Sequence, residues 1–423
     1  MLLSTKCVFD LVVFDEASQI IPTHVVGALY RAKQCVVMGD ENQLPPTTFF
    51  DRTDRDDEMI PELRAFLEST GTNLIAWAKQ SNLPTYELKN FYRGSEELIR
   101  VSNQRFYTTG INSGLLTLPD TKPTGHIIHH VIAPHEDTDH GTLAVIEKVK
   151  SVTAAILNDP SSEGVIIVCT GQSDFEKAEV VLADLLFERE SDEEKFGATE
   201  KPRKQVRLRR IEDVQGLEDS HVIMFLRQPQ RTADGYINLQ FLGPINGVNG
   251  HKRLNVALTR ARKKVILVTT FQADELAAGG VDLNDGCSFL YNYMKDIDVI
   301  DRNTKTFSDN STNWERAMYE VVFKGESLSG WRTHYEYGRS RYPITYAFRR
   351  TAMGKEDGNF VYAMETDLGR FTRKDFDPRD LYNRDKRMAE RLGWKHANLF
   401  PVLDMFTKSK AKLRSDYAKK LKQ

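Results

Sequence analysis

The sequence of 423 residues has few cysteines, no long apolar run and almost no net charge. The four cysteines, Cys7, Cys35, Cys169 and Cys287, are far apart and form no CxxC pair, which argues against a disulfide framework or a zinc ribbon. No stretch approaches the roughly 18 apolar residues of a membrane span, and the N-terminus lacks the pattern of a signal peptide. We therefore expect a cytoplasmic protein with reduced thiols and no membrane partner.

The charge balance gives no general attraction to phosphate. Lysine and arginine number 58 against 60 acidic residues, so the formal net charge is −2. Any affinity for nucleic acid must then come from local basic patches. The apolar share of 40% and the charged share of 28% are ordinary for a globular protein, and the length allows two or three domains.

Apolar runs alternate with helical periodicity along the first 270 residues or so. Phe9–Phe14 and 34–38 are predicted as buried parallel strands, with a helix at 24–32 between them. Further helices are expected at 61–80, 95–106, 142–157 and 174–186, and further strands at 126–132, 164–169, 221–226 and 264–270. This alternation predicts an α/β fold with parallel sheets, in which functional residues lie in loops at the strand ends.

An acidic pair follows the first predicted strand. The string LVVFDEASQ places Asp15 and Glu16 at the strand end. Adjacent side chains there point in opposite directions, so one carboxylate can hold hydrated Mg²⁺ while the other reaches an attacking water. An isolated acidic pair is more often a solvated strand end or a helix cap.

A second polar loop follows the next predicted strand. The string GDENQLPP presents Gly39, Asp40 and Gln43 on a loop stiffened by Pro45 and Pro46. A glutamine amide at this position could sense a γ-phosphate or position a water molecule. The two strings together strengthen the catalytic interpretation of the acidic pair.

DEASQ followed by GDENQLPP resembles motifs II and III of superfamily 1 helicases, the class that contains the nonsense-mediated-decay helicases and the replication helicase-nucleases. Three later strings occur in the order of that family: FYRGSEELI, EDVQGLEDSHVIM and RLNVALTRARKKVILV. The resemblance implies two RecA-like lobes, ATP as substrate, Mg²⁺ held by Asp15, and a nucleic-acid partner.

The resemblance also implies roles for the later strings. Arg93 and Arg260 would reach the γ-phosphate from the second lobe, where guanidinium groups stabilise the charge of phosphoryl transfer. The other residues expected near the nucleotide are Gln215 and Gly216 at the phosphates and bound strand, Glu218 at the ribose, and Arg253. Taken singly, Arg93 and Arg262 could each be ordinary salt-bridge arginines. Arginines on the opposite lobe would make hydrolysis depend on lobe closure.

The phosphate-binding loop (P-loop) GxxxxGK[ST] does not occur in this sequence. That loop cradles phosphates with backbone N–H groups and supplies a lysine. In the family it precedes motif II, and fourteen residues precede Asp15 here. The open explanations are a fragment, which we favour, a split protein whose P-loop lies on a separate chain, or a degenerate helicase.

The last hundred residues have a different pattern. Their order of helix, two strands, helix and strand resembles small endonuclease domains related to very-short-patch repair nucleases and the PD-(D/E)XK group. Glu365 and Asp367 in METD would share one strand face, which suits a divalent cation. Further candidates are Glu315 or Glu320 on the first helix and Asp385 with Arg384 on the later one. Thr345 stands where the family has its catalytic aspartate, so a degenerate domain is an equal alternative.

These observations predict a truncated first lobe at 1–84, a second lobe at 85–275, a linker at 276–311, an endonuclease-like domain at 312–407 and a basic tail at 408–423. The expected function is that of the C-terminal portion of an ATP-dependent helicase or translocase with a DNA endonuclease domain. The competing class is a non-catalytic nucleic-acid-binding or regulatory subunit. The nuclease-like domain favours DNA over RNA by analogy alone.

Overall fold

The computed structural model describes most of the chain up to residue 298 and parts of the remainder. The described residues are 8–46, 73–108, 114–117, 125–187, 204–278, 283–298, 331–335, 344–352, 355–366, 390, 392–399, 407–409, 411–413 and 415–416. None of the helices in these ranges is both long and apolar enough to span a bilayer.

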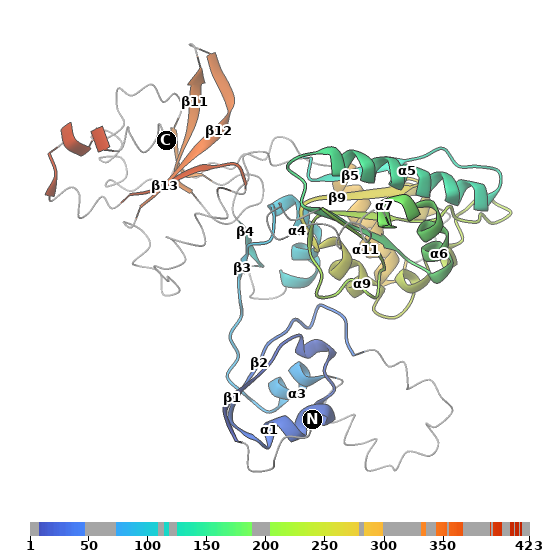
Figure 1. The fold of residues 1–423 in the computed structure, drawn as a ribbon, viewed down its shortest axis with the longest axis horizontal. Helices are drawn as coiled ribbons and strands as arrows, with labels where there is room; N and C mark the ends of the chain where they lie inside the picture. The colour runs from blue at the N-terminus through green and yellow to red at the C-terminus, as the bar shows by residue number, and fades with distance from the viewer. Residues whose placement is uncertain are drawn as a thin grey trace.

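The first lobe is small. Strands β1 (Phe9–Phe14) and β2 (Ala32–Val37) pair in parallel, and α1 (Pro22–Leu29) connects them. The short helix η1 (Ala17–Gln19) and α3 (Leu74–Gln80) lie beside them (Figure 1). The core of this lobe contains Phe14, Ala17, Val25 and Leu74. The predicted strand, helix and parallel strand are therefore present.

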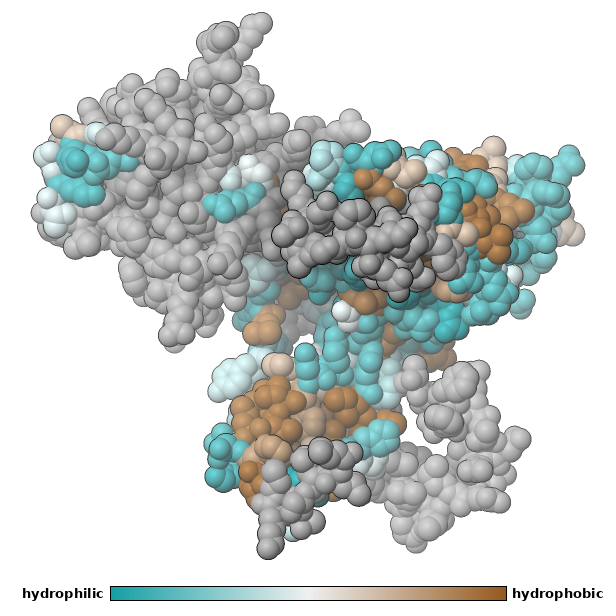
Figure 2. All heavy atoms as spheres, in the orientation of Figure 1, coloured by the Kyte–Doolittle hydropathy of each residue, from teal (hydrophilic) through white to brown (hydrophobic). Residues whose placement is uncertain are grey.

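The prediction that these two strands are buried is wrong for the described residues. Leu11 and Val13 are each 49% exposed, and Val36 is 41% exposed. Parallel strands are normally buried on both faces in larger sheets, whereas this sheet has two strands. Figure 2 shows apolar residues gathered on the surface of this lobe.

The second lobe is built on a five-stranded parallel sheet in the order β5-β9-β8-β6-β7. Its strands are β5 (Ile127–Val131), β6 (Gly164–Cys169), β7 (Gln205–Arg210), β8 (Asp219–Phe225) and β9 (Ala261–Thr269). Every residue of β6 and β8 is buried. The α/β fold class with parallel sheets is confirmed.

Two layers of helices cover this sheet because alternate residues of each strand face opposite sides. In β8, Ile223 and Phe225 pack with α5 (Thr138–Asn158) and α6 (Gln172–Val181). Val222 and Met224 pack on the opposite side. The elements of that side include α4 (Glu96–Ser102), η2 (Asn103–Tyr107), η3 (Leu239–Asn246), α9 (Gly250–Leu258), α10 (Ala273–Leu276) and α11 (Asp285–Asp298). The remaining short elements are α7 (Ala183–Phe187) and the pair β3 (Asn90–Phe91) and β4 (Leu116–Thr117).

Two parts of the second lobe differ from the sequence prediction. Helix α11 lies within the range assigned to a linker, and its Cys287, Leu290 and Met294 are fully buried in the core. Their spacing of three and four residues is that of a helix face, so 285–298 belongs to the lobe. Strand β7 lies in the charged stretch before residue 210, where the alternation of Leu208 with arginines indicates an edge strand.

The C-terminal part contains a four-stranded sheet. Strands β10 (Trp331–Tyr335), β11 (Ile344–Ala352) and β12 (Lys355–Thr366) are antiparallel, and β13 (Lys395–Leu399) is parallel to β12. Thr345 lies on β11, and Glu365 lies on β12 in register with Asn398. The other proposed nuclease residues lie outside the described residues: Glu315, Glu320, Asp367, Arg384 and Asp385.

Candidate active site

The acidic pair and the GDENQL loop meet at the ends of β1 and β2. Glu16 has a left-handed backbone (φ 51°), and its N–H donates to Asp15 Oδ1 at 2.9 Å. The Ala17 N–H donates to the Met38 carbonyl at 2.9 Å. A Cβ on Gly39 would lie 2.9 Å from Ala17 N and 2.6 Å from Ile75 Cδ1. Glycine therefore allows the two turns to touch.

Gln215 joins this turn from the second lobe. Its Nε2 donates to Glu16 Oε2 at 2.9 Å, across 199 residues of sequence. Its Oε1 is buried and has no hydrogen-bond partner among the described residues. Gly216 follows with φ 78° and open space where a side chain would be. An unpaired buried amide oxygen costs free energy, so this position suits a ligand that donates a hydrogen bond.

Arg260 is a buried cation, only 4% exposed, that faces the GDENQL loop. Its Nε donates to the Val256 carbonyl at 3.0 Å, and its Nη2 donates to Gln43 Oε1 at 3.1 Å. Burial, followed by the charge of Arg93, lowers the pKa of Arg260 to about 10. The group remains charged at neutral pH, and no carboxylate of the described residues is bonded to it. A buried charge of this kind favours an anionic ligand.

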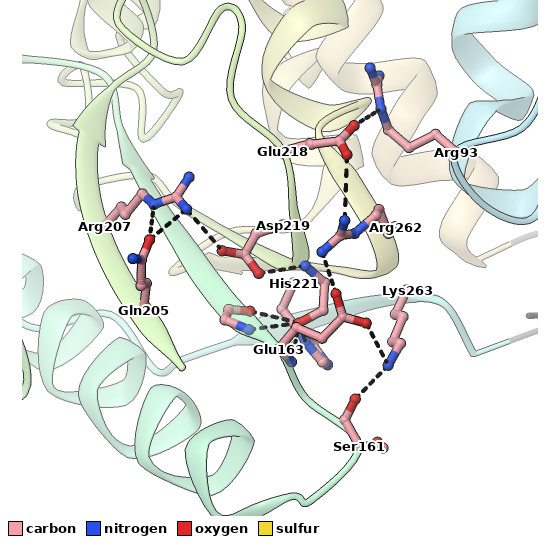
Figure 3. Close-up of polar contacts among 12 residues, drawn as sticks. Arg93, Ser161, Glu163, Gln205, Arg207, Glu218, Asp219, His221, Arg262 and Lys263 are labelled. Atoms are coloured by element: carbon pink, nitrogen blue, oxygen red, sulfur yellow. Dashed lines mark hydrogen bonds and ion pairs between the residues drawn. The ribbon is translucent and has the colours of Figure 1, made fainter. Parts of the chain in front are cut away.

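Arg93 and Glu218 form the next part of the site (Figure 3). Arg93 Nε donates to Glu218 Oε2 at 3.1 Å, and its Nη1 donates to the Thr259 carbonyl at 2.9 Å. The other oxygen of Glu218 accepts from Arg262 at 3.4 Å, and Arg262 also pairs with Glu163. Glu218 therefore holds two arginines, and Arg93 is close enough to affect the pKa of Arg260.

The structure brings most predicted site residues together but places Arg253 elsewhere. Arg253 Nε donates to Glu212 Oε1 at 3.1 Å, and its Nη1 donates to the Pro244 carbonyl at 3.2 Å. These contacts lie within the second lobe and involve none of the other residues expected near the nucleotide. Asp15 remains exposed beside Glu16.

The carboxylates fit a magnesium ion that is shared with phosphate. Among the described residues, no group of three or more His, Cys, Asp or Glu side chains could hold a metal ion. Mg²⁺ is usually bound by one or two carboxylates together with substrate phosphates and water. Asp15 and Glu16 match that requirement, whereas a cation held by protein ligands alone would need more donors.

Among the described residues of the second lobe, four that were not predicted from the sequence hydrogen-bond to the GDENQL loop. The Phe106 carbonyl accepts from Asn42 Nδ2 at 3.3 Å. The Tyr107 hydroxyl donates to Asp40 Oδ2 at 2.6 Å. Asn255 Nδ2 donates to the Asn42 carbonyl at 3.0 Å, and Lys252 Nζ donates to the Glu41 carbonyl at 2.8 Å. Asn255 lies in the string RLNVALTRAR, so the sequence indicated that the segment around it is functional but did not single out Asn255 itself. Nothing in the sequence singled out Tyr107.

Comparisons with known proteins point to one class. A family profile described as an AAA domain matches residues 2–50. The uncharacterized ATP-dependent helicase MG140 of Mycoplasma genitalium is 26% identical over 334 residues, which are 75% of this chain and 28% of that protein. Over this region the chain is similar to an ATP-dependent helicase. The predicted resemblance to superfamily 1 helicases is confirmed to this extent.

A DNA replication ATP-dependent helicase/nuclease, DNA2 of Gallus gallus, is 26% identical over 268 residues, covering 62% of this chain and 23% of that protein. The chain therefore spans less than a third of the length of these curated relatives.

Solved structures give weaker matches. The PRRSV helicase covers 61% of this chain, and the chain covers 34% of it, with a TM-score of 0.28 and 14% identity. The C-terminal domain of a "possible DNA helicase" from Lactobacillus plantarum covers 42% of this chain and is itself covered to 86%, with a TM-score of 0.24 and 15% identity. At these scores the two structures carry no argument about the site.

Proposed function

We propose that this chain is the C-terminal portion of an ATP-dependent nucleic-acid helicase or translocase of superfamily 1, acting in the cytoplasm. One observation carries the proposal. Glu16 contacts Gln215, and Gln43 contacts Arg260, so residues about 200 positions apart in sequence meet at one place between two lobes. The expected catalytic residues of both lobes therefore share a single site.

Each residue has a role in the proposed reaction. Bound Mg²⁺ and ATP supply the cation and the γ-phosphate that is transferred to water. Asp15 would hold the cation through its exposed carboxylate, and Glu16 would orient the attacking water. Arg260 and Arg93 stabilise the charge that develops on the phosphoryl oxygens. One N–H of the Gln43 amide bonds to Asp40 and its Oε1 holds Arg260, and its second N–H would donate to the γ-phosphate or to the water.

The remaining residues bind the rest of the nucleotide. Gly216 leaves an open backbone turn near the phosphates, and the unpaired oxygen of Gln215 would accept a hydrogen bond from a water molecule beside them. Glu218 accepts hydrogen bonds from the ribose after exchanging its contact with Arg93. Arg253 has a supporting role through Glu212, because it bonds to none of these residues.

Hydrolysis would be coupled to movement along nucleic acid. Arg260 and Glu16 belong to different lobes, so the complete site exists only when the lobes are together. DNA is favoured over RNA because two curated relatives are named DNA replication helicase/nucleases. The sequence contains no GxxxxGK[ST] string, so the proposal requires a P-loop from another polypeptide segment, either of the same protein or of a separate chain.

ATP hydrolysis by this chain together with the polypeptide segment that supplies the P-loop, with and without single-stranded DNA, tests the proposal. We expect turnover stimulated by DNA, with at least a roughly hundredfold loss in Glu16→Gln because the water-orienting carboxylate is removed. Glu147→Gln, a change at an exposed glutamate of α5, is the matched control and should keep full turnover. Equal turnover in Glu16→Gln and wild type would contradict the catalytic assignment. No turnover with retained DNA binding would favour the non-catalytic subunit.

A second candidate function concerns the C-terminal sheet, which we propose is a metal-dependent DNA endonuclease domain. The arrangement of β11, β12 and β13 places Glu365 one residue before the end of β12, beside β13. Glu315, Asp367 and Asp385 would complete its metal site. Plasmid cleavage in Mg²⁺ or Mn²⁺ should occur in wild type and be lost in Glu365→Gln. An intact plasmid with wild type, together with cleavage by Thr345→Asp, would show a degenerate domain.

A further inference from the structure

The loop at 39–44 belongs to the first lobe in sequence but is bonded mainly to the second lobe. Lys252 and Asn255 of α9 donate to the carbonyls of Glu41 and Asn42 at 2.8 and 3.0 Å. Leu44 is 8% exposed and packs in the core of the second lobe. We call 39–44 the docked loop. It stays with the second lobe as long as these contacts hold.

Asp40 is the centre of the hydrogen bonds within the docked loop. Its Oδ1 accepts from the Asn42 N–H at 2.9 Å, and its Oδ2 accepts from Gln43 Nε2 at 3.2 Å. The same Oδ2 accepts from the Tyr107 hydroxyl of the second lobe at 2.6 Å. A short hydrogen bond to a carboxylate is among the stronger ones in proteins. Tyr107 therefore fixes the carboxylate that organises the loop.

These bonds determine which way the Gln43 amide faces. Its Nε2 is a donor and bonds to Asp40, while its Oε1 is an acceptor and bonds to Arg260. If Asp40 turned away, the amide could rotate and present its donors to the guanidinium group, which has no acceptor. The sequence of contacts Tyr107–Asp40–Gln43–Arg260 thus sets the amide in the orientation that Arg260 requires.

We infer that Tyr107 is a positioning residue of the proposed ATPase site, whose hydroxyl fixes Asp40 and thereby aligns Gln43 with Arg260. Its catalytic consequence rests on the proposed function, but the docking of 39–44 does not. Burial, followed by the charge of Asp40, raises the pKa of Tyr107. The phenol therefore keeps its proton and can donate throughout the physiological pH range.

The docked loop is also a main connection between the lobes. The segment from 81 to 90 runs along the surface, with Tyr86 89% exposed and Leu88 90% exposed. Residues 81–90 are all exposed, so this segment couples the positions of the two lobes only weakly. The docked loop, in contrast, is held by charged and buried groups. Motion of the second lobe would therefore reach the acidic turn of the first lobe through Asp40 and Gly39.

Hydrogen exchange of the whole chain without nucleotide tests the inference. Tyr107→Phe removes one hydroxyl and keeps the ring, so packing is preserved. We expect the amides of 40–44 to exchange about tenfold faster or more, because a hydrogen bond to a charged group is lost. Exchange in β6 and β8 should stay unchanged. Tyr236→Phe, at a tyrosine that is 41% exposed, is the matched control and should leave 40–44 unchanged.

Variants of Asp40 separate a positioning role from general stabilisation. Asp40→Asn keeps an acceptor oxygen and should retain most of the protection of 40–44, whereas Asp40→Ala should lose it. Combining Tyr107→Phe with Asp40→Ala should add nothing to Asp40→Ala alone, since both remove the same bond. Additive effects, or unchanged exchange in Tyr107→Phe, would overturn the inference.

Turnover measurements distinguish a failure of the inference from a failure of the proposed function. If the wild-type chain does not hydrolyse ATP even with the segment that supplies the P-loop, the proposed function fails, while the exchange result still decides whether Tyr107 fixes the loop. If it does hydrolyse ATP, Tyr107→Phe should lower kcat roughly tenfold and leave KM nearly unchanged. A rise in KM with constant kcat would contradict the alignment of Gln43.

Discussion

Replacing Arg260 by methionine should stabilise the second lobe while removing its proposed function. The fall in the pKa of Arg260 from 12.5 to about 10 shows that the fold disfavours its charge. At about 1.4 kcal/mol per pKa unit, this corresponds to about 3 kcal/mol. Loss of the bonds to the Val256 carbonyl and to Gln43 offsets about 1–2 kcal/mol of this. We therefore expect methionine, which has a similar length and no charge, to raise the free energy of unfolding of the lobe by about 1–2 kcal/mol.

Hydrogen exchange in β8 measures this change, because exchange of buried strand amides reports the free energy of opening the lobe. Arg209→Met replaces an exposed arginine of β7 and should change that free energy by less than about 0.5 kcal/mol. Slower exchange in Arg260→Met alone is the expected result. Faster exchange would refute the reasoning, since Arg260 would then be a structural cation and not one held for a ligand.

Two further predictions concern pH and packing. Burial lowers the pKa of His221 from 6.5 to about 4. Between these two pH values His221 is protonated in the unfolded chain but not in the folded lobe. The free energy of unfolding of the lobe should therefore fall by about 3 kcal/mol as the pH falls through that interval. Acid unfolding should show this slope in wild type and a much smaller one in His221→Gln, and equal slopes would count against it. Gly39→Ala should destabilise the first lobe by about 1–3 kcal/mol through contacts with Ala17 and Ile75. Gly27→Ala, within α1 and with no contact closer than 3.7 Å, should be neutral or stabilising, and exchange in β1 compares the two.

The sequence predicted what depends on short-range pattern. Apolar runs such as 164–169 are buried strands because parallel strands covered on both faces contain few polar residues. Polar residues after β1 and β2 meet because parallel strand ends lie at one edge of the sheet. The resemblance implied that Glu16 and Gln215 both lie near the nucleotide, but the hydrogen bond between them was not predicted.

What the sequence did not predict depends on long-range contacts. The sequence prediction assigned α11 to a linker. Polar residues alternate with the apolar ones in its sequence, and its apolar face is recognisable only once the rest of the lobe is seen to cover it. The exposure of Leu11 depends on how many strands the sheet has, which a single strand does not reveal. Tyr107 has no distinctive neighbours in sequence, and its role comes from Asp40, 67 residues away.

The most direct test of the central claim is the ratio of the dissociation constants of ADP and of a slowly hydrolysed ATP analogue, both measured with Mg²⁺ and with the segment that supplies the P-loop present. If Arg260 and Glu16 face one nucleotide between the lobes, wild type should bind the triphosphate about tenfold or more tightly than ADP, because the buried guanidinium bonds to the γ-phosphate. Arg260→Gln should bring the ratio close to one, and Arg209→Gln should leave it unchanged. An unchanged ratio in Arg260→Gln, or a wild-type chain that does not distinguish the two nucleotides, would contradict the account.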